Sequence, residues 1–477
     1  MGNSYRRKLN VVAFLLVVVL LCGGTMTISG CSNQTATETK VLNFSSNYEI
    51  DATLDPYNNS LEYTAQVQIT NTGKDSTNEL YFHLYGNRYK TENEGVVVIS
   101  VTDSNYTPIK FEMKDDDQLI LLTLDDPLDD EAIVFFSCKA TIPEMESVYG
   151  VALDGEIQMS FFYPQLVMYD KNGWNTKPLA HDADGRYLVM SDFAMTIHAP
   201  SEYEVVCNGI ELSRVARNGQ TTYVFHANQR RELIFIAYTD YIRLERSVGD
   251  TKILGYFNDS YNPSHMEIAM DDAAFSMEFF NGVYMEYPYE TLIVTNKAWT
   301  RSIGSMEYSG LFTVAFTAVV EVDGTEEFGS TDTVFHEMAH QWFYFIVGNN
   351  EYQEPWLDEA FATFSTVLCV EAAGQEEQSE IWWELYKTIS DSTGGAVNVA
   401  YDEPDIIVSN LFYYKGAFFL KELMDAVGKN EFLSILSEYC VKFAYSIATT
   451  DDFLNVVQER TTVDVESIID KYIVSSS

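Results

Sequence analysis

The chain has 477 residues, which is too long for one compact core and favours two or three domains. Its hydrophobic content of 46% and aromatic content of 14% are those of a globular protein and exclude a disordered chain. The formal net charge of −42 repels phosphate backbones and argues against nucleic-acid binding. The same negative field attracts cationic ligands, including peptides with a free α-amine, although solubility alone also accounts for it.

The N-terminal segment has the pattern of a signal peptide followed by a lipidation site. Residues 6–8 (Arg-Arg-Lys) are basic, and the apolar run over 11–21 is too short to span a bilayer as a mature helix. Residues 28–31 (Ile-Ser-Gly-Cys) resemble a bacterial lipobox, in which cleavage precedes the cysteine and its thiol carries a diacylglycerol. We therefore expect a signal peptide over 1–30 and a lipid anchor at Cys31 that holds the protein on the extracytoplasmic face of the cell membrane. An ordinary secretory signal is the alternative.

The remaining cysteines lie far apart and show no C-x-x-C spacing, so they predict neither a zinc knuckle nor a disulfide framework. They are Cys138, Cys207, Cys369 and Cys440. We expect buried free thiols, and a single disulfide stays undecided.

A polar tether is predicted over 31–44, and an N-terminal β domain over 45–247. Apolar and polar residues alternate over 61–69, and Asn71-Thr72-Gly73 then provides a turn signal. Further strands are predicted over 95–101, 119–124, 133–138, 193–198, 221–226 and 233–238. Strands at this spacing favour a β-sandwich or a saddle-shaped β domain.

The second domain, predicted over 248–477, has a different pattern. Pro263 can start a helix, and apolar residues follow it at helical spacing as far as residue 284. Two strands are predicted over 291–295 and 311–322. Helices are predicted over 331–347, 355–373, 376–390, 412–427, 430–443, 451–459 and 465–474. The fold class is therefore α+β, with a small sheet followed by a helical C-terminal half.

Residues 336–340 (His-Glu-Met-Ala-His) fit the pattern H-E-x-x-H within a predicted helix. His336 and His340 are one helical turn apart, so their imidazoles project on one side, and two neutral nitrogens at that separation suit Zn²⁺. Glu337 lies beside a ligand and is expected to act as the general base. The alternative is a structural pair of helical histidines.

A catalytic zinc also needs a third protein ligand and an open position. The metzincin pattern would require Gly and His at positions 343 and 346, but the chain has Phe343 and Ile346. A carboxylate from the following helix is the other option, and Glu359 offers it nineteen positions after His340. We therefore predict one Zn²⁺ per chain, held by His336, His340 and Glu359.

At these residues the chain resembles the aminopeptidase N family of gluzincin metallopeptidases. The matching stretches follow one another in order along nearly the whole mature chain: 304–308, 336–343, 356–362, 413–417 and 448–453, with weaker similarity over 80–85 and 167–175. The resemblance implies a thermolysin-like catalytic domain after the β domain. Longer family members carry a further helical domain over the active site, so for a chain that ends at Ser477 we expect a more open cleft.

The resemblance also implies substrate-binding residues. Glu307, in the stretch that contains Gly304 and Met306, stands where the family binds the free α-amine of the substrate. The usual motif is G-A-M-E-N, and Ser305 and Tyr308 depart from it here.

Two further residues follow from the same resemblance. Tyr413 matches the tyrosine that stabilises the oxyanion, and the adjacent Tyr414 is its alternative. Gln158 lies in the region where the family places a glutamine at the first substrate pocket.

Together these features predict a zinc-dependent aminopeptidase that removes N-terminal residues from peptides with a free N-terminus. The alternatives are an endopeptidase or an epoxide-hydrolase-like enzyme on the same site, and an inactive surface lipoprotein that binds peptides. The preferred first residue, the physiological peptide and the oligomeric state stay open.

Overall fold

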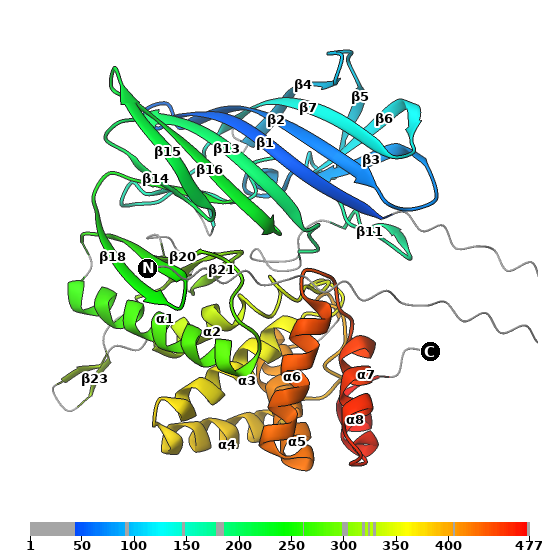
Figure 1. Cartoon of the computed structure of the whole chain (residues 1–477), viewed down its shortest axis with the longest axis vertical. Helices are drawn as coiled ribbons and strands as arrows, with labels where there is room; N and C mark the ends of the chain where they lie inside the picture. Colours follow the sequence, from blue (N-terminus) through cyan, green and yellow to red (C-terminus); the bar gives the residue numbers. More distant parts are fainter. Residues whose placement is uncertain are drawn as a thin grey trace, which may run out of the picture. The chain divides into compact units, whose positions relative to one another are not determined.

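The first half of the chain folds into β-sheets, and the second half forms helices beside a smaller sheet (Figure 1). The computed structural model describes residues 43–90, 95–145, 148–177, 186–260, 262–297, 304–316, 320–322, 325–327, 331–403 and 406–474. The predicted signal peptide, the lipidation site at Cys31 and nearly all of the predicted tether lie outside these residues. The described residues all belong to one compact unit, Lys40–Ser477.

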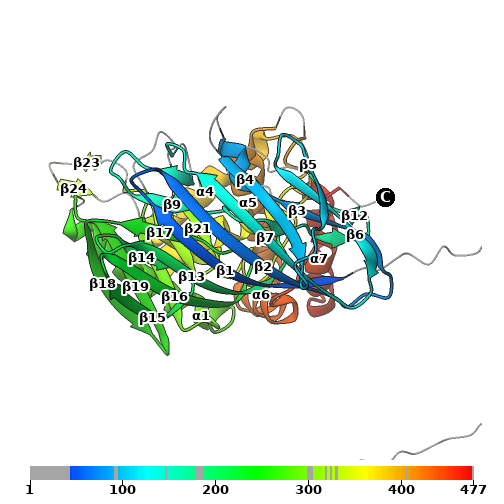
Figure 2. The same ribbon diagram turned by 90° about the horizontal axis from the view of Figure 1, so that it is seen from above.

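A seven-stranded sheet in the order β15-β16-β13-β1-β2-β7-β4 forms the outer layer of the first half (Figures 1 and 2). Its strands are β1 (Phe44–Asp55), β2 (Ser60–Asn71), β4 (Gly95–Asp103), β7 (Glu131–Thr141), β13 (Ser191–Pro200), β15 (Ile210–Arg217) and β16 (Gln220–Arg230). β1 pairs with β13 in parallel and with β2 in antiparallel orientation. Along β1 every second side chain is buried, as period-two strands with one face on a core require.

Two four-stranded sheets, β10-β3-β6-β5 and β14-β17-β9-β8, supply further strands to this half. Their strands are β3 (Thr77–His83), β5 (Lys110–Lys114), β6 (Leu119–Leu128), β8 (Tyr149–Val151), β9 (Ile157–Met159), β10 (Gln165–Leu166), β14 (Glu204–Cys207) and β17 (Phe235–Tyr238). A short hairpin, β11 (Tyr169–Asp170) and β12 (Gly173–Trp174), and the 3₁₀ helix η1 (Tyr85–Tyr89) complete it. Aromatic side chains from several of these sheets share one core, in which the Tyr63 hydroxyl donates to Phe162 O at 2.6 Å.

The second half begins with a five-stranded sheet in the order β18-β19-β20-β22-β21. Its strands are β18 (Tyr241–Val248), β19 (Thr251–Asn258), β20 (Thr291–Asn296), β21 (Met306–Tyr308) and β22 (Leu311–Val314), and a separate pair is β23 (Val320–Val322) and β24 (Thr325–Glu327). The predicted domain boundary at residue 247 falls inside β18. The strand predicted over 311–322 is shorter than expected, because β22 ends at Val314.

The helices of the second half lie below the sheets in Figure 1. They are α1 (Pro263–Val283), α2 (Thr331–Ala339), α3 (Trp356–Ala372), α4 (Glu376–Ser392), the π-helix η3 (Ser409–Lys415), α5 (Gly416–Val427), α6 (Lys429–Phe443), α7 (Thr450–Arg460) and α8 (Glu466–Tyr472). The α+β fold class predicted from the sequence is confirmed. Two predicted helices differ: α2 ends at Ala339 instead of residue 347, and the segment predicted as one helix from residue 412 begins as η3.

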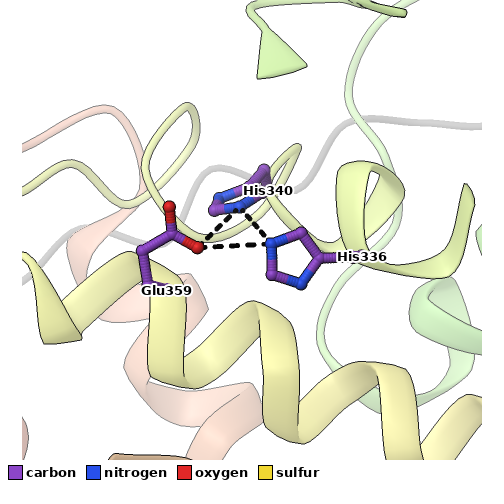
Figure 3. A group of neighbouring side chains, drawn as sticks. All are labelled: His336, His340 and Glu359. Carbon is purple, nitrogen blue, oxygen red and sulfur yellow. Dashed lines mark hydrogen bonds and ion pairs between the residues drawn. The ribbon is translucent and has the colours of Figure 1, made fainter. Parts of the chain in front are cut away.

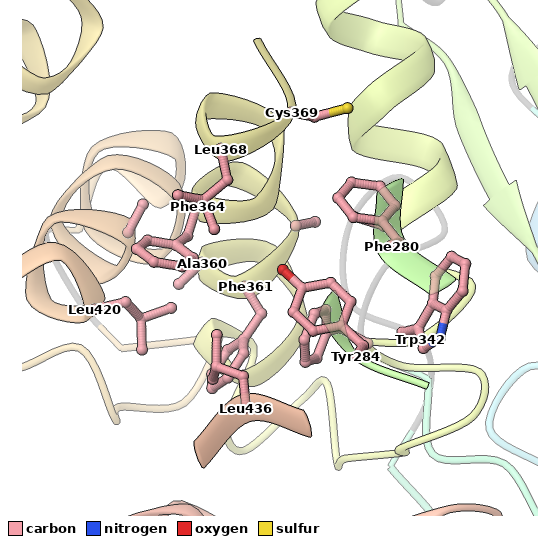
Figure 4. Close-up of a cluster of buried hydrophobic side chains, with 14 of the residues drawn as sticks. Phe280, Tyr284, Trp342, Ala360, Phe361, Phe364, Leu368, Cys369, Leu420 and Leu436 are labelled. Atoms are coloured by element: carbon pink, nitrogen blue, oxygen red, sulfur yellow. The ribbon is translucent and has the colours of Figure 1, made fainter. Parts of the chain in front are cut away.

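Helix α3 is the centre of the helical core and is buried along most of its length. Figure 4 shows its Phe361, Phe364 and Leu368 among side chains from α1, α5 and α6. Burial of each such side chain contributes about 1.5–3 kcal/mol to stability. A helix held this firmly fixes the direction of any polar side chain near its first turn.

All four cysteines beyond the N-terminal segment are buried and unpaired in the described structure, as expected. Among the described residues, no helix combines the length and the apolar character that crossing a membrane would need.

Candidate active site

The two motif histidines lie at the C-terminal end of α2. His336 is in its last turn, and His340 follows directly after Ala339, with its backbone N–H still bonded to His336 O at 3.2 Å. The helix was predicted to continue to residue 347, and this prediction is wrong for two reasons. Gln341 turns its side chain to the neighbouring strand, and Tyr344 adopts φ +96°, which no α-helix contains.

The structure brings His336, His340 and Glu359 together, although they come from two helices (Figure 3). Glu359 Oε2 lies 3.2 Å from His336 Nε2 and 3.5 Å from His340 Nε2. The two Nε2 atoms are 3.1 Å apart. All three side chains therefore point one ligand atom at a common centre.

These separations fit a zinc ion. Ligand atoms at about 2.1 Å from a tetrahedral zinc lie about 3.4 Å from one another, which is close to the three observed distances. Two imidazole nitrogens and one carboxylate oxygen are also the donor set of a catalytic zinc with an open fourth position. Glu359 Oε2 is buried and has no well-directed hydrogen-bond donor among the described residues, so it is available to a cation.

The electrostatics of this cluster favour positive charge at its centre. Burial opposes the charged form of His340, but Glu359 outweighs it and holds the pKa of His340 well above its usual range. Burial likewise opposes the charged form of Glu359, and His340 and His336 hold its pKa well below the ordinary value. A divalent cation supplies this positive charge more strongly than a proton does.

Tyr413 completes the cluster from the other side. Its hydroxyl donates a hydrogen bond of 2.6 Å to Glu359 Oε1, the oxygen that does not face the imidazoles. Its ring lies parallel to the His336 ring, with centroids 5.8 Å apart. The ring of Tyr414 lies instead against Tyr386, at 5.0 Å. Of the two candidates, Tyr413 is therefore the residue in contact with the predicted metal ligands.

A cavity of about 550 Å³ opens onto the cluster. Its wall includes His336, Glu337 and Glu359, together with the predicted substrate-binding residues and both tyrosines, Gly304, Met306, Glu307, Tyr413 and Tyr414. Trp382, Leu385 and Tyr386 of α4 line another part of it. The cavity therefore combines a candidate metal-ligand cluster, several carboxylates and an apolar wall, as expected of a binding or active site.

Comparison with known proteins identifies this arrangement. Residues 267–472, which carry every residue of the cluster, match the model of the peptidase family M1 domain. This part of the chain therefore carries a peptidase M1 domain. The fold agrees with that of a solved M1 zinc metallopeptidase.

Curated relatives of this chain include several aminopeptidases. Aminopeptidase M1-B of Oryza sativa subsp. japonica is 26% identical over 375 residues, which are 72% of this chain and 42% of the relative. Leucyl aminopeptidase of Saccharolobus solfataricus is 25% identical over 299 residues, 59% of this chain and 38% of the relative. This chain thus spans less than half the length of these curated relatives.

Solved M1 structures match almost the whole chain. The M1 zinc metallopeptidase from Deinococcus radiodurans superposes with a TM-score of 0.69 at 16% identity, covering 91% of this chain and 94% of that one. A mutant of that protein bound to a Tyr-Ser-Ala substrate gives a TM-score of 0.67 at 17% identity, covering 91% of this chain and 95% of the other. At these identities the likeness concerns the fold.

Glu337 and Lys297 lie together in the cavity of the M1 domain. Burial, and then the neighbouring Glu307, raise the pKa of Glu337 well above its ordinary value. Burial lowers the pKa of Lys297 to about 8, against the opposing effect of Glu156, Glu337 and Glu307. The sequence does not predict Lys297 as a site residue, because a lysine without a motif around it gives no signal.

Glu307 lies on β21 and lines the same cavity as the candidate metal ligands His336 and Glu359. Gln341 holds this strand in place, because its amide nitrogen donates to Tyr308 O at 3.0 Å and its amide oxygen accepts from Gly310 N at 2.9 Å. Gln158 is fully buried, and its amide nitrogen donates to the Tyr308 hydroxyl at 2.6 Å. Gln341 thus joins the strand that carries Glu307 to the segment that carries His340.

The sequence also gave no sign of Arg186, which is fully buried and contacts Glu307. It lies outside any predicted element, and its three glutamate partners are 46 to 165 positions away along the chain. No local pattern could have predicted these contacts.

Proposed function

We propose that this chain is a zinc-dependent aminopeptidase that removes single residues from the free N-terminus of peptides. The observation that carries the proposal is the convergence of His336, His340 and Glu359 at zinc-like separations, in a cavity that also contains Glu307 and Glu337. The same cavity thus combines the ligands of a metal, a general base and a carboxylate for an ammonium group.

Each of these residues has a task that its chemistry allows. Zinc in such a site supplies a Lewis acid for the scissile carbonyl and for water. Glu307 binds the α-ammonium by a charge-assisted hydrogen bond, which places the first peptide bond of the substrate at the metal cluster. Glu337 takes the proton of the attacking water and passes it to the departing amine. Tyr413 donates its hydroxyl to the oxygen on which negative charge develops.

The exopeptidase part of the proposal depends on the ammonium group. A carboxylate fixed beside the reacting bond favours chains that end there and disfavours chains that continue or carry a blocked amine. An endopeptidase on the same metal site would not gain from a free amine at this position. The two activities are therefore separable with matched substrates.

The experiment is a comparison of aminoacyl fluorogenic substrates with a free and with an N-acetylated amine, each with and without a chelator. The proposal predicts cleavage of the free-amine substrates only, its loss with chelator and its return with added zinc. Equal cleavage of both substrates would indicate an endopeptidase or another hydrolase. Bound zinc without cleavage of any substrate would favour an inactive peptide-binding protein.

We also propose that the protein is anchored to the membrane through a lipid on Cys31 and acts on the extracytoplasmic face. The support is the basic, apolar and small-residue pattern that precedes this cysteine. Cell fractionation of the wild type and of Cys31→Ala tests it. The wild type should sediment with membranes and the variant should not, and equal distribution of both would contradict the anchor.

A further inference from the structure

We infer that Arg186 is a positioning residue, which orients Glu307 for the α-ammonium of the substrate. The inference rests on the proposed aminopeptidase function and assigns a role to a residue that does not itself touch the reacting bond. Arg186 lies at the centre of three glutamates, Glu232, Glu307 and Glu351.

Several contacts hold the Arg186 guanidinium in one position. Arg186 has no solvent exposure, and its Nη2 donates to Glu307 Oε1. Its Nη1 lies 3.3 Å from Glu232 Oε2, and its backbone N–H donates to Glu351 Oε2 at 2.8 Å. The Tyr344 ring centroid lies 5.0 Å from Arg186 Cζ, a cation–π distance that fixes the plane of the guanidinium.

The cluster connects segments that meet only in the folded chain. Arg186 precedes β13 and Glu232 follows β16, whereas Glu307 is on β21 and Glu351 precedes α3. One planar guanidinium thus joins the first half of the chain to the strand that carries the amine-binding carboxylate. Lysine cannot replace it fully, because an ammonium group lacks the fork that reaches several carboxylates at once.

The residues around Arg186 carry an excess of negative charge that a second cation would balance. Three buried carboxylates face one guanidinium, so the cluster lacks positive charge when all of them are ionised. In line with this, burial raises the pKa values of Glu232 and Glu351 to about 7, although Arg186 opposes the rise. Of these three carboxylates, that of Glu307 also lines the cavity that contains His336 and Glu359. A cation that enters the cavity therefore reaches the residues around Arg186 at Glu307.

An ammonium group on the substrate is the cation that meets these conditions. Arg186 holds one oxygen of Glu307 and thereby fixes the carboxylate in the orientation that the ammonium needs. Without Arg186, Glu307 can rotate, and amine recognition weakens while the metal site stays intact. The effect should therefore fall on the preference for an amine and not on metal binding.

The test compares two zinc-binding inhibitors, an amino-acid hydroxamate and the same hydroxamate without its α-amine, on the zinc-loaded protein. The ratio of their inhibition constants measures amine recognition alone. A hydrogen bond to a charged group supports a wild-type preference of about tenfold or more for the amine-bearing compound. Arg186→Lys should reduce this ratio at least about fivefold, with unchanged affinity for the amine-free hydroxamate.

Two further variants keep the test decisive. In a Glu307→Ala background, adding Arg186→Lys should leave the ratio unchanged, because Arg186 acts through Glu307. If Arg186→Lys does not fold, the paired variant Arg186→Gln with Glu232→Gln removes one positive and one negative charge together. Its ratio should fall in the same way.

Arg231→Lys is the matched control. Arg231 is also buried, but it donates to the carbonyl oxygens of Phe345, Leu188 and Ser446. Its substitution should reduce stability without changing the ratio of the two hydroxamates. A fall of the ratio in this control equal to that in Arg186→Lys would assign both effects to general loosening of the fold and overturn the inference.

The outcomes separate the inference from the proposed function. If the wild type shows no preference for the amine-bearing hydroxamate, the aminopeptidase proposal itself fails. If the wild type shows the preference and Arg186→Lys keeps it, or both hydroxamates weaken equally, only the role of Arg186 is wrong.

Discussion

Replacement of Tyr413 by phenylalanine removes one oxygen from the candidate active site and little else. The phenylalanine ring can keep the parallel contact with His336, whose centroid lies 5.8 Å away. What is lost is the 2.6 Å hydrogen bond that the hydroxyl donates to Glu359 Oε1. The variant therefore isolates the hydroxyl group from the packing of the aromatic ring.

The magnitude follows from the length and charge of that bond. A short hydrogen bond to a carboxylate is worth about 1.5–3 kcal/mol, or roughly 10- to 150-fold in an equilibrium constant. Loss of a group that orients a metal ligand costs about 10- to 100-fold in metal affinity. Loss of a donor to the transition-state oxygen costs about 10²- to 10³-fold in kcat.

The assay measures the two effects separately. Zinc affinity is obtained by competition with a chelating dye, and kcat is then measured at saturating zinc with a free-amine substrate. We expect zinc affinity to fall about tenfold and kcat at saturating zinc to fall about 100-fold. Tyr414→Phe is the control, because the Tyr414 ring lies against Tyr386, and it should change neither quantity.

A kcat within threefold of wild type at saturating zinc would refute the catalytic role. Tyr413 would then serve only to hold Glu359, which the weakened zinc binding would show. Unchanged zinc affinity together with unchanged kcat would also contradict the contact seen between Tyr413 and Glu359.

Three other substitutions, one of them with a matched control, test separate parts of the molecule. Glu337→Gln should lower turnover by about 10³-fold while retaining one zinc per chain, and near-normal turnover in a zinc-loaded sample would exclude Glu337 as the base. Gly416→Ala should lower the free energy of unfolding by about 1–3 kcal/mol and weaken zinc binding, because a Cβ there would lie 2.6 Å from the Ala360 Cβ beside Glu359. Gly282→Ala in α1, where nothing lies within 4 Å of the added Cβ, is its control and should be neutral or slightly stabilising in thermal unfolding. Burial lowers the pKa of His83 from 6.5 to about 4. Between these two values the unfolded chain takes up a proton that the folded chain does not, so the free energy of unfolding falls as the pH is lowered. Between pH 7 and pH 5 the wild type should lose roughly 2 kcal/mol more than His83→Gln in urea unfolding, and parallel pH profiles would contradict the burial of this imidazole.

The sequence predicts the features that local chemistry encodes. The α+β fold class is confirmed, and residues 267–472 match the peptidase M1 domain, since alternating strands, amphipathic helices and the H-E-x-x-H pattern are all local signals. The three predicted metal ligands are brought together in the structure because their helices pack through large apolar faces. Their role in binding zinc stays a prediction until metal is measured.

The features that the sequence does not predict depend on tertiary contacts. The helix at residue 331 ends early because Gln341 bonds to the turn after β21, a partner more than thirty positions away. The choice between Tyr413 and Tyr414 depends on the π-helix η3, whose wider turn shifts the direction of each side chain. Arg186 gives no periodic signal, and its partners are defined only by the folded chain.

The central claim is that one zinc ion, held by His336, His340 and Glu359, makes this chain an enzyme. The most direct test is to remove metal with a chelator and to titrate zinc back while following cleavage of a free-amine aminoacyl substrate. Activity should return in proportion to added zinc, reach its limit at one ion per chain, and fail to return in Glu359→Ala. Full cleavage by metal-free protein, or full recovery in that variant, would contradict the claim.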